Sequence, residues 1–376
     1  MVRLSLARLA LVIPLAPSAG IQAQGDDAPG AARTESAPSR PLDTAALRAV
    51  YLDLLARPPF LDERERWLGA DRAALVDELL AGRELWERWT EEQLYYFLLI
   101  DNFRPHSDRV LAIPEGLQER RLGVREAIHH IALSPSFDRR NPGPDTFVTV
   151  VMEQMLGITV QKQPRELEIG KRLYDGQDGV FLGERGSSQA DVVRIAIEDE
   201  GFLVELLRRE HERLLRAEAS RRDLKGWARE LDSNPRGYAD VVRGWMLSED
   251  YERRLGEKKL QPNRLYVRTM YVDLMDRLPD PDEERRLRGA LDGLSDPGPL
   301  RAVLARLLLD SGKTTVPDKA EIRDATTWVG GLFERLLGRP AADDELKTFV
   351  TAFHDPACRP TTVVYAIVSH PEYHRY

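Results

Sequence analysis

Cysteine is almost absent from this chain. Cys358 is the only one among 376 residues, so an intramolecular disulfide framework is excluded. The fold must therefore be stabilised mainly by burial of apolar side chains. The 42% of apolar residues and 31% of charged residues are typical of a well-solvated protein that forms a core.

Long apolar runs are also lacking. The run over residues 9–16 is far shorter than the roughly 20 residues that cross a bilayer. It follows Arg3 and Arg8 and precedes small residues, which is the pattern of a secretory signal. We therefore expect residues 1–23 to be a signal peptide and residues 24–41 a flexible leader. The mature protein is expected to be periplasmic or extracellular, with no transmembrane segment.

Positive charge is not in excess. The net charge is −8 and the isoelectric point about 5.6, so we expect no nucleic-acid partner, because phosphate binding needs a concentrated basic surface. The 7 histidines form no His-Glu-x-x-His pattern, and no Cys-x-x-Cys-His haem site is present. DSGKTT at residues 310–315 lacks the first glycine of a phosphate loop. We predict no cofactor, no metal site and no catalytic residue.

One phrase is present three times. YLDLLARPPFLDE spans residues 51–63, YVDLMDRLPDPDE spans 271–283 and FERLLGRPAADDE spans 333–345. Each phrase has a helical apolar pattern, an arginine shortly before a proline, and then carboxylates. Proline disfavours helix in the residue before it, and acidic residues favour a first helical turn. Each phrase therefore predicts a helix end, a corner and a new helix start.

The apolar pairs within these phrases have weaker counterparts elsewhere. The second members of successive pairs lie at positions 55, 99, 156, 215, 275 and 337, spaced 44 to 62 residues apart. This near-regular spacing indicates a repeat architecture. We predict an all-α array or bundle of about six three-helix modules with no substantial β-sheet. Modules 1 and 2 would occupy residues 42–140, modules 3 and 4 residues 141–258, and modules 5 and 6 residues 259–376.

The shared arginines are the strongest candidate site residues. A cation at a helix end meets both the helix dipole and the carboxylates that open the next helix. We therefore predict a structural corner, and the alternatives are a clamp for a carboxylate or phosphate ligand and a calcium site at the acidic clusters. The residues of the predicted corner are Arg57, Arg277, Arg339, Asp62, Glu63, Glu283, Glu284, Asp343 and Asp344.

Two groups of exported bacterial modules resemble these segments. Residues 47–89 resemble a domain of unknown function from planctomycete secreted proteins, which is often fused to cytochrome-type modules. Residues 328–376 resemble a short helical repeat of secreted and surface-layer proteins, and more distantly the linker modules of phycobilisomes. The resemblance implies an α-helical interaction module outside the cytoplasm and carries no catalytic residue.

These observations favour a non-enzymatic, exported scaffold that binds a protein partner of the envelope or the extracellular space. The sequence does not settle whether the chain is an enzyme. The alternative is an enzyme-associated domain linked to envelope electron transfer or polymer breakdown. Metal-dependent adhesion is a third hypothesis, which rests on the acidic clusters.

Overall fold

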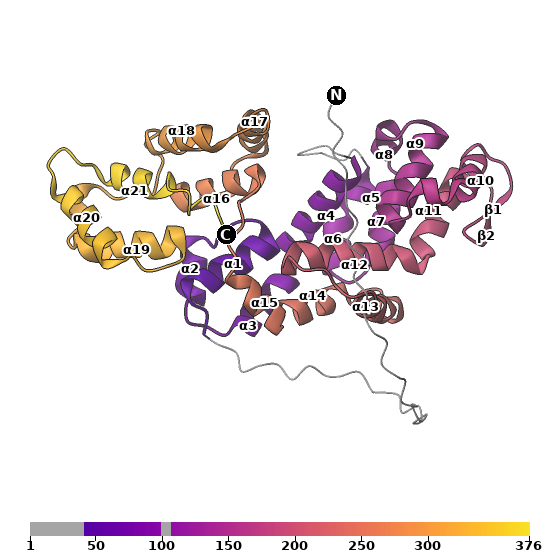
Figure 1. Cartoon of the computed structure of the whole chain (residues 1–376), viewed down its shortest axis with the longest axis horizontal. Helices are drawn as coiled ribbons and strands as arrows, with labels where there is room; N and C mark the ends of the chain where they lie inside the picture. The colour runs from indigo at the N-terminus through magenta and orange to yellow at the C-terminus, as the bar shows by residue number, and fades with distance from the viewer. Residues whose placement is uncertain (1–40, 99–106) are drawn as a thin grey trace, which may run out of the picture. The chain divides into compact units, whose positions relative to one another are not determined.

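The computed structural model describes residues 41–98 and 107–376. The predicted signal peptide and nearly all of the predicted leader therefore lie outside the described residues. All contacts below lie within the unit Ser36–Tyr376. This unit is built from helices and one small hairpin (Figure 1), which confirms the predicted all-α fold.

The N-terminal helices are α1 (Thr44–Leu55), α2 (Leu61–Trp67), α3 (Arg72–Ala81) and α4 (Arg83–Leu98). The next segment contains α5 (Asp108–Leu111), α6 (Ile113–Gln118), α7 (Val124–Ala132), α8 (Pro135–Arg140), α9 (Gly143–Val150), the π-helical stretch η1 (Val151–Met155), the 3-10 turn η2 (Val160–Lys162), α10 (Pro164–Tyr174) and α11 (Gln189–Glu198). Between α10 and α11, β1 (Gly179–Phe181) and β2 (Glu184–Gly186) form an antiparallel hairpin.

The second half of the chain is purely helical in the described ranges. It contains α12 (Glu200–Leu215), α13 (Arg221–Ser233), α14 (Tyr238–Met246), α15 (Glu249–Leu255), α16 (Asn263–Met275), α17 (Pro281–Asp292), α18 (Gly298–Leu309), the 3-10 turn η3 (Lys319–Glu321), α19 (Ala325–Leu337), α20 (Asp343–His354) and α21 (Pro360–Val368). Nowhere in residues 41–98 and 107–376 is a helix long and apolar enough to span a membrane.

Four of these helices are directly followed by a residue whose backbone has the left-handed conformation. Ala56, Arg216, Asp276 and Gly338 follow α1, α12, α16 and α19 with φ between 52° and 70°. Each backbone N–H donates to the carbonyl four residues earlier, which satisfies an acceptor left free at the helix end. These corners directly follow predicted pair positions 55, 215, 275 and 337. Predicted position 99 lies outside the described residues, and Leu156 follows η1 with a φ of −109°.

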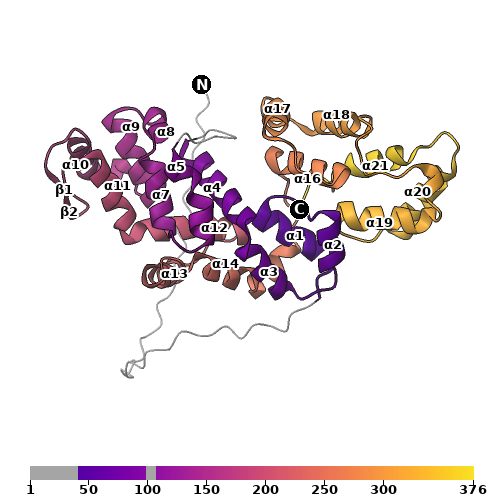
Figure 2. The ribbon, with the colours of Figure 1, turned by 180° about the vertical axis from the view of Figure 1, so that it is seen from behind.

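Each of these four corners belongs to a set of three consecutive helices. The sets are α1–α2–α3, α12–α13–α14, α16–α17–α18 and α19–α20–α21. Three-helix modules are therefore present at each of them, and α4–α11 separate the first from the second. Figure 2, which shows the reverse side, has α16–α21 gathered as one group with α1 next to α19.

Apolar burial produces two core clusters. The first cluster runs from Leu42 to Tyr251 and the second from Tyr266 to Tyr373. Most of the tryptophans are buried in the first cluster, whereas Trp227 and Trp328 are only partly buried against the first and second clusters. Burial of these side chains is the dominant favourable contribution to folding.

Candidate functional site

The first corner arginine is fully engaged by a carboxylate of its own module and by one from α4. Arg57 donates through Nη1 and Nη2 to Glu63 at 2.6 and 2.8 Å, and through Nε and Nη2 to Glu84 at 2.5 and 2.7 Å. Nη1 also reaches the Pro58 carbonyl at 3.0 Å. Only 2% of the side chain is exposed. Burial alone would lower the pKa of Arg57, but the hydrogen bonds to both carboxylates outweigh it and raise the pKa.

The third corner repeats this geometry. Arg339 donates to Glu345 at 2.7 and 2.9 Å, to Glu372 at 2.8 to 3.0 Å, and to the Pro340 carbonyl at 3.1 Å. These hydrogen bonds lower the pKa of Glu345 and of Glu372 to about 2. Both carboxylates are therefore ionised at any physiological pH and cannot act as general acids.

The middle corner arginine, Arg277, forms fewer hydrogen bonds than Arg57 and Arg339 do. Arg277 donates to the Leu278 carbonyl at 2.9 Å and to Glu283 at 3.2 Å, and 43% of its side chain is exposed. Glu84 and Glu372 follow the ends of α3 and α21 by three and four residues. Four residues after α18 the chain has Lys313, which cannot accept a bond from an arginine. This replacement accounts for the missing second carboxylate.

At each of the three corners the arginine binds a carboxylate of its own module: Arg57 binds Glu63, Arg277 binds Glu283 and Arg339 binds Glu345. That carboxylate also accepts the N–H of its helix N-cap residue: Phe60 to Glu63, Asp280 to Glu283 and Ala342 to Glu345. The carboxylate of this module that binds Arg339 is Glu345, which directly follows the predicted residues Asp343 and Asp344. The other predicted carboxylates occupy helix starts without bonding a corner arginine in the described ranges: Asp62, Asp343, Asp344 and Glu284. Glu284 bonds Arg264 and Arg268 instead, at 3.0 and 2.9 Å.

Two buried aspartates that were not predicted lie close to these corners. Asp53 accepts from Tyr251 at 2.8 Å and from both terminal nitrogens of Arg254 at 2.5 Å. Asp273 accepts from Tyr373 at 2.9 Å and from Arg48 at 2.9 and 2.7 Å. Their exposed fractions are 3% and 5%. The aspartate in the third position of YLDLLAR and YVDLMDR is the sequence signal that could have identified them.

Arginine occupies the same position in the other two modules. Counted back from the left-handed residue, Arg213 in α12 and Arg335 in α19 correspond to Asp53 and Asp273. Arg213 donates to the Asp53 carbonyl at 2.8 Å and to Glu210 at 2.9 and 3.0 Å. The carbonyl of Arg335 accepts from Arg48 at 3.1 Å. Arg213 thus joins α12 to α1, and Arg48 joins α1 to both α16 and α19.

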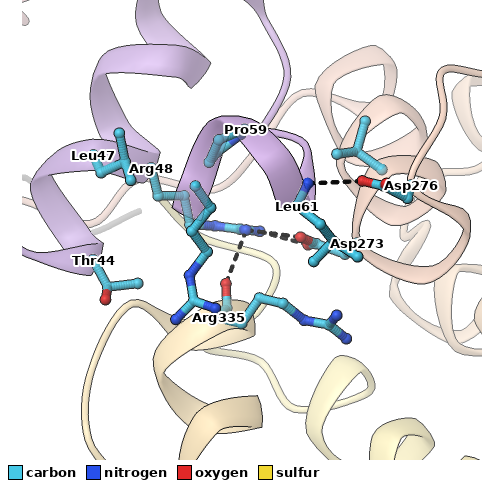
Figure 3. A pocket seen from close by; sticks show the side chains of 10 residues that line it. Thr44, Leu47, Arg48, Pro59, Leu61, Asp273, Asp276 and Arg335 are labelled. Carbon is cyan, nitrogen blue, oxygen red and sulfur yellow. Dashed lines mark hydrogen bonds and ion pairs between the residues drawn. The ribbon is translucent and has the colours of Figure 1, made fainter. Parts of the chain in front are cut away.

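A small cavity of about 20 Å³ lies around the Arg48–Asp273 pair. Figure 3 shows Arg48 crossing from α1 to Asp273, and the Leu61 N–H donating to Asp276 at 2.9 Å. A neighbouring cavity of about 230 Å³ shares three lining residues with it, namely Leu61, Arg64 and Arg335. α2 and α19 thus place two arginines between two hollows.

A groove of about 400 Å³ lies between α4–α6 and the α16–α17 corner. Its apolar lining is Leu55, Leu94, Val110, Leu111, Pro114, Leu278, Pro279 and Pro281. Its polar lining is Glu84, Glu87, Arg88, Thr90, Glu91, Arg268 and Glu284. We call this hollow the α4–α17 groove.

No group of three or more histidine, cysteine or carboxylate side chains is arranged for a metal ion in the part of the chain that the structure describes. Comparisons of the chain with protein-family models, curated sequences and solved structures found no match. Function is therefore inferred from the contacts of the side chains and from the hollows that they line.

Proposed function

We propose that this protein is an exported, non-enzymatic scaffold of the cell envelope that binds a protein partner through the α4–α17 groove. The observation that carries this proposal is a groove with a largely apolar lining, in which Leu111 and Leu278 are exposed, and with a charged rim, which is the anatomy of a protein interface. Leu111 is 56% exposed and Leu278 37% exposed at this groove. Contiguous exposed apolar surface of this kind typically marks an interaction site.

The rim charges support binding rather than acid–base chemistry. Glu91 binds Arg268 at 3.0 Å, and Glu284 binds the same arginine at 2.9 Å. Burial would raise the pKa of Glu91, but the charges of Arg268 and Arg264 outweigh it and lower the pKa. Glu91 is therefore ionised and paired, whereas a catalytic acid has a pKa near the working pH.

The floor suits an apolar segment of a partner. Pro279 and Pro281 hold the wall that follows α16 in a fixed conformation, because proline locks its own φ. Leu94 and Val110 are buried at the floor, and Leu111 stands more open. A rigid apolar surface loses little entropy when a partner binds. The expected occupant is an apolar segment of an envelope protein.

Site-specific photo-crosslinking tests this assignment. A photoreactive residue is placed at Leu111 or Leu278, and a matched control at Leu307, which is 61% exposed on α18. Both groove positions should crosslink the same envelope protein, and Leu307 should not. Leu111→Glu should abolish copurification of that protein with an unchanged circular dichroism spectrum. Identical adducts from all three positions, or undiminished copurification with Leu111→Glu, would contradict the proposal.

A further inference from the structure

We infer that Arg64 and Arg335 bind the carboxylate of a small ligand with an apolar body, in the cavity between α2 and α19. This inference is independent of the α4–α17 groove. Among residues 41–98 and 107–376, no hydrogen bond or ion pair engages the guanidinium of Arg335, and its Nε is buried. Nε of Arg64 is likewise buried without a partner.

The nearby carboxylates do not satisfy these cations. Glu334 is half exposed and lies 3.9 Å from Arg64. Asp273 is occupied by Arg48 and Tyr373, as described above. Burial lowers the pKa of Arg335, and the charges of Arg64 and Arg48 lower it further, although Asp273 acts in the opposite direction. Two half-buried guanidinium groups of like charge, each with a buried Nε that has no partner, favour an anion that joins them.

Asp276 is the remaining carboxylate at the first cavity. Its Oδ1 accepts the backbone N–H of Leu61 at 2.9 Å and so caps α2. In the described part of the chain it forms no ion pair with Arg64 or Arg335. Figure 3 shows Asp276 on the far side of Asp273 from the Arg335 backbone.

Comparison between modules shows that Arg335 lacks the carboxylate partner that its counterpart in α12 has. The corresponding arginine of α12, Arg213, is paired with Glu210, three residues earlier in the same helix. Three residues before Arg335 the chain has Leu332, which is buried and lines the 230 Å³ cavity. The internal carboxylate of one module is therefore replaced in the other by an apolar side chain and a cavity. A ligand carboxylate can take the place of Glu210.

The size and lining of the cavity indicate the chemistry of the part of the ligand beyond its carboxylate. Its volume of about 230 Å³ lies below the range of about 300–1,000 Å³ that is usual for sites of drug-sized ligands, so only a compact ligand fits. Beyond the two arginines, the lining is mostly apolar and includes Val316, Pro317, Trp328, Leu332 and Val364. The hydroxyls of Thr315 and Thr327 add two polar positions at this cavity. This chemistry fits an aromatic or branched aliphatic carboxylic acid better than an inorganic anion.

Calorimetric titration of the full chain tests the inference with benzoate, benzamide and inorganic phosphate as probes. Benzoate should bind with a Kd of about 1 mM or tighter, benzamide should not bind, and phosphate should bind more weakly. Arg335→Gln and Arg64→Gln should each weaken benzoate binding about tenfold or more. Arg66→Gln is the matched control, because Arg66 lies on α2 but is 63% exposed and pairs with Glu78.

Leu332→Glu provides a test that does not depend on losing an arginine. The new carboxylate should pair with Arg335, so this variant should melt at a higher temperature than Leu332→Gln and should bind no benzoate. The inference is overturned if benzoate fails to bind at about 10 mM, or if Arg335→Gln binds it normally. Equal affinity for benzamide or stronger binding of phosphate would overturn the ligand class.

Discussion

Asp53 and Asp273 show how single residues hold this repeat together. Each carboxylate is nearly completely buried and receives a tyrosine hydroxyl and a bidentate arginine from outside its own helix. A buried ion pair contributes little net stability when compared with apolar residues of the same size. Removal of one partner is costly, however, because the other charge stays buried without compensation.

Asp53→Asn should therefore destabilise the protein by about 3 kcal/mol, because Arg254 loses its compensating charge. Urea denaturation followed by circular dichroism measures this change. Asp250→Asn is the control, since Asp250 is exposed and pairs with the exposed Arg253. The control should cost no more than about 0.5 kcal/mol. Equal effects of the two substitutions would show that the buried network does not contribute as described.

A second residue-scale prediction concerns pH. Glu345 and Glu372 have a pKa of about 2 in the folded protein, below the ordinary value of 4.5, because Arg339 bonds both. A lowered folded-state pKa contributes stability above pH 4.5, and this contribution is lost as the pH falls towards 2. Arg339→Gln should therefore be less stable than wild type by about 1 kcal/mol at neutral pH, and the difference should shrink steadily below pH 4.5.

Denaturation curves recorded from neutral pH to about pH 2 would measure that difference. Arg285→Gln serves as the control, because the Arg285–Asp282 pair is highly exposed on both sides. Its difference from wild type should be small at every pH. A difference for Arg339→Gln that stays constant or grows on acidification would contradict the assigned role of Arg339.

At the scale of elements, the left-handed corner residue explains the helix–helix turns. Only Gly338 has the backbone freedom that this conformation favours, whereas the other three corners have a side chain there. Two of these side chains compensate by forming contacts: Asp276 caps α2, and Arg216 donates to the carbonyls of Glu257 and Tyr376 at 2.9 and 3.0 Å. Ala56 has no such polar group.

Ala56→Gly should accordingly stabilise the protein by about 1 kcal/mol, since a left-handed conformation costs an L-residue about that much. Gly338→Ala should destabilise it by about 1–2 kcal/mol. The new Cβ would also lie 3.3 Å from the Cα of Ala45, which is close contact. Thermal melts of the two variants, recorded against wild type, should shift in opposite directions. Shifts of the same sign would contradict this account of the corners.

Across the whole molecule, local pattern in the sequence was enough to predict the all-α fold. Arginine, proline and a first-turn carboxylate are close in sequence, so Arg57 and Glu63 could be paired from spacing alone. Glu84 lies 27 residues from Arg57, and Asp273 lies 225 residues from Arg48. No periodicity relates such distant positions. The second carboxylates, the Asp–Tyr–Arg networks and the cavity at Arg335 therefore required the structure.

The same long-range contacts connect the two core clusters. Arg48 bonds Asp273, Glu91 bonds Arg268, and the Leu61 N–H bonds Asp276, so polar groups form the link between α1–α4 and α16. Polar links leave less apolar surface shared between the clusters than a continuous core would. Local unfolding follows such boundaries, because regions open in cooperative units.

Arg48→Met should therefore loosen the second cluster more than the first. The substitution leaves Asp273 buried with only Tyr373, which should lower the free energy of opening of α16–α21 by about 3 kcal/mol. Native-state hydrogen exchange should show faster exchange in α16, α19 and α21, with α7 and α11 nearly unchanged. Arg243→Gln is the control, because the exposed Arg243–Asp77 pair lies within the first cluster. Equal acceleration in both clusters would show that they open as one unit, and that the Arg48–Asp273 pair does not couple two separable cores.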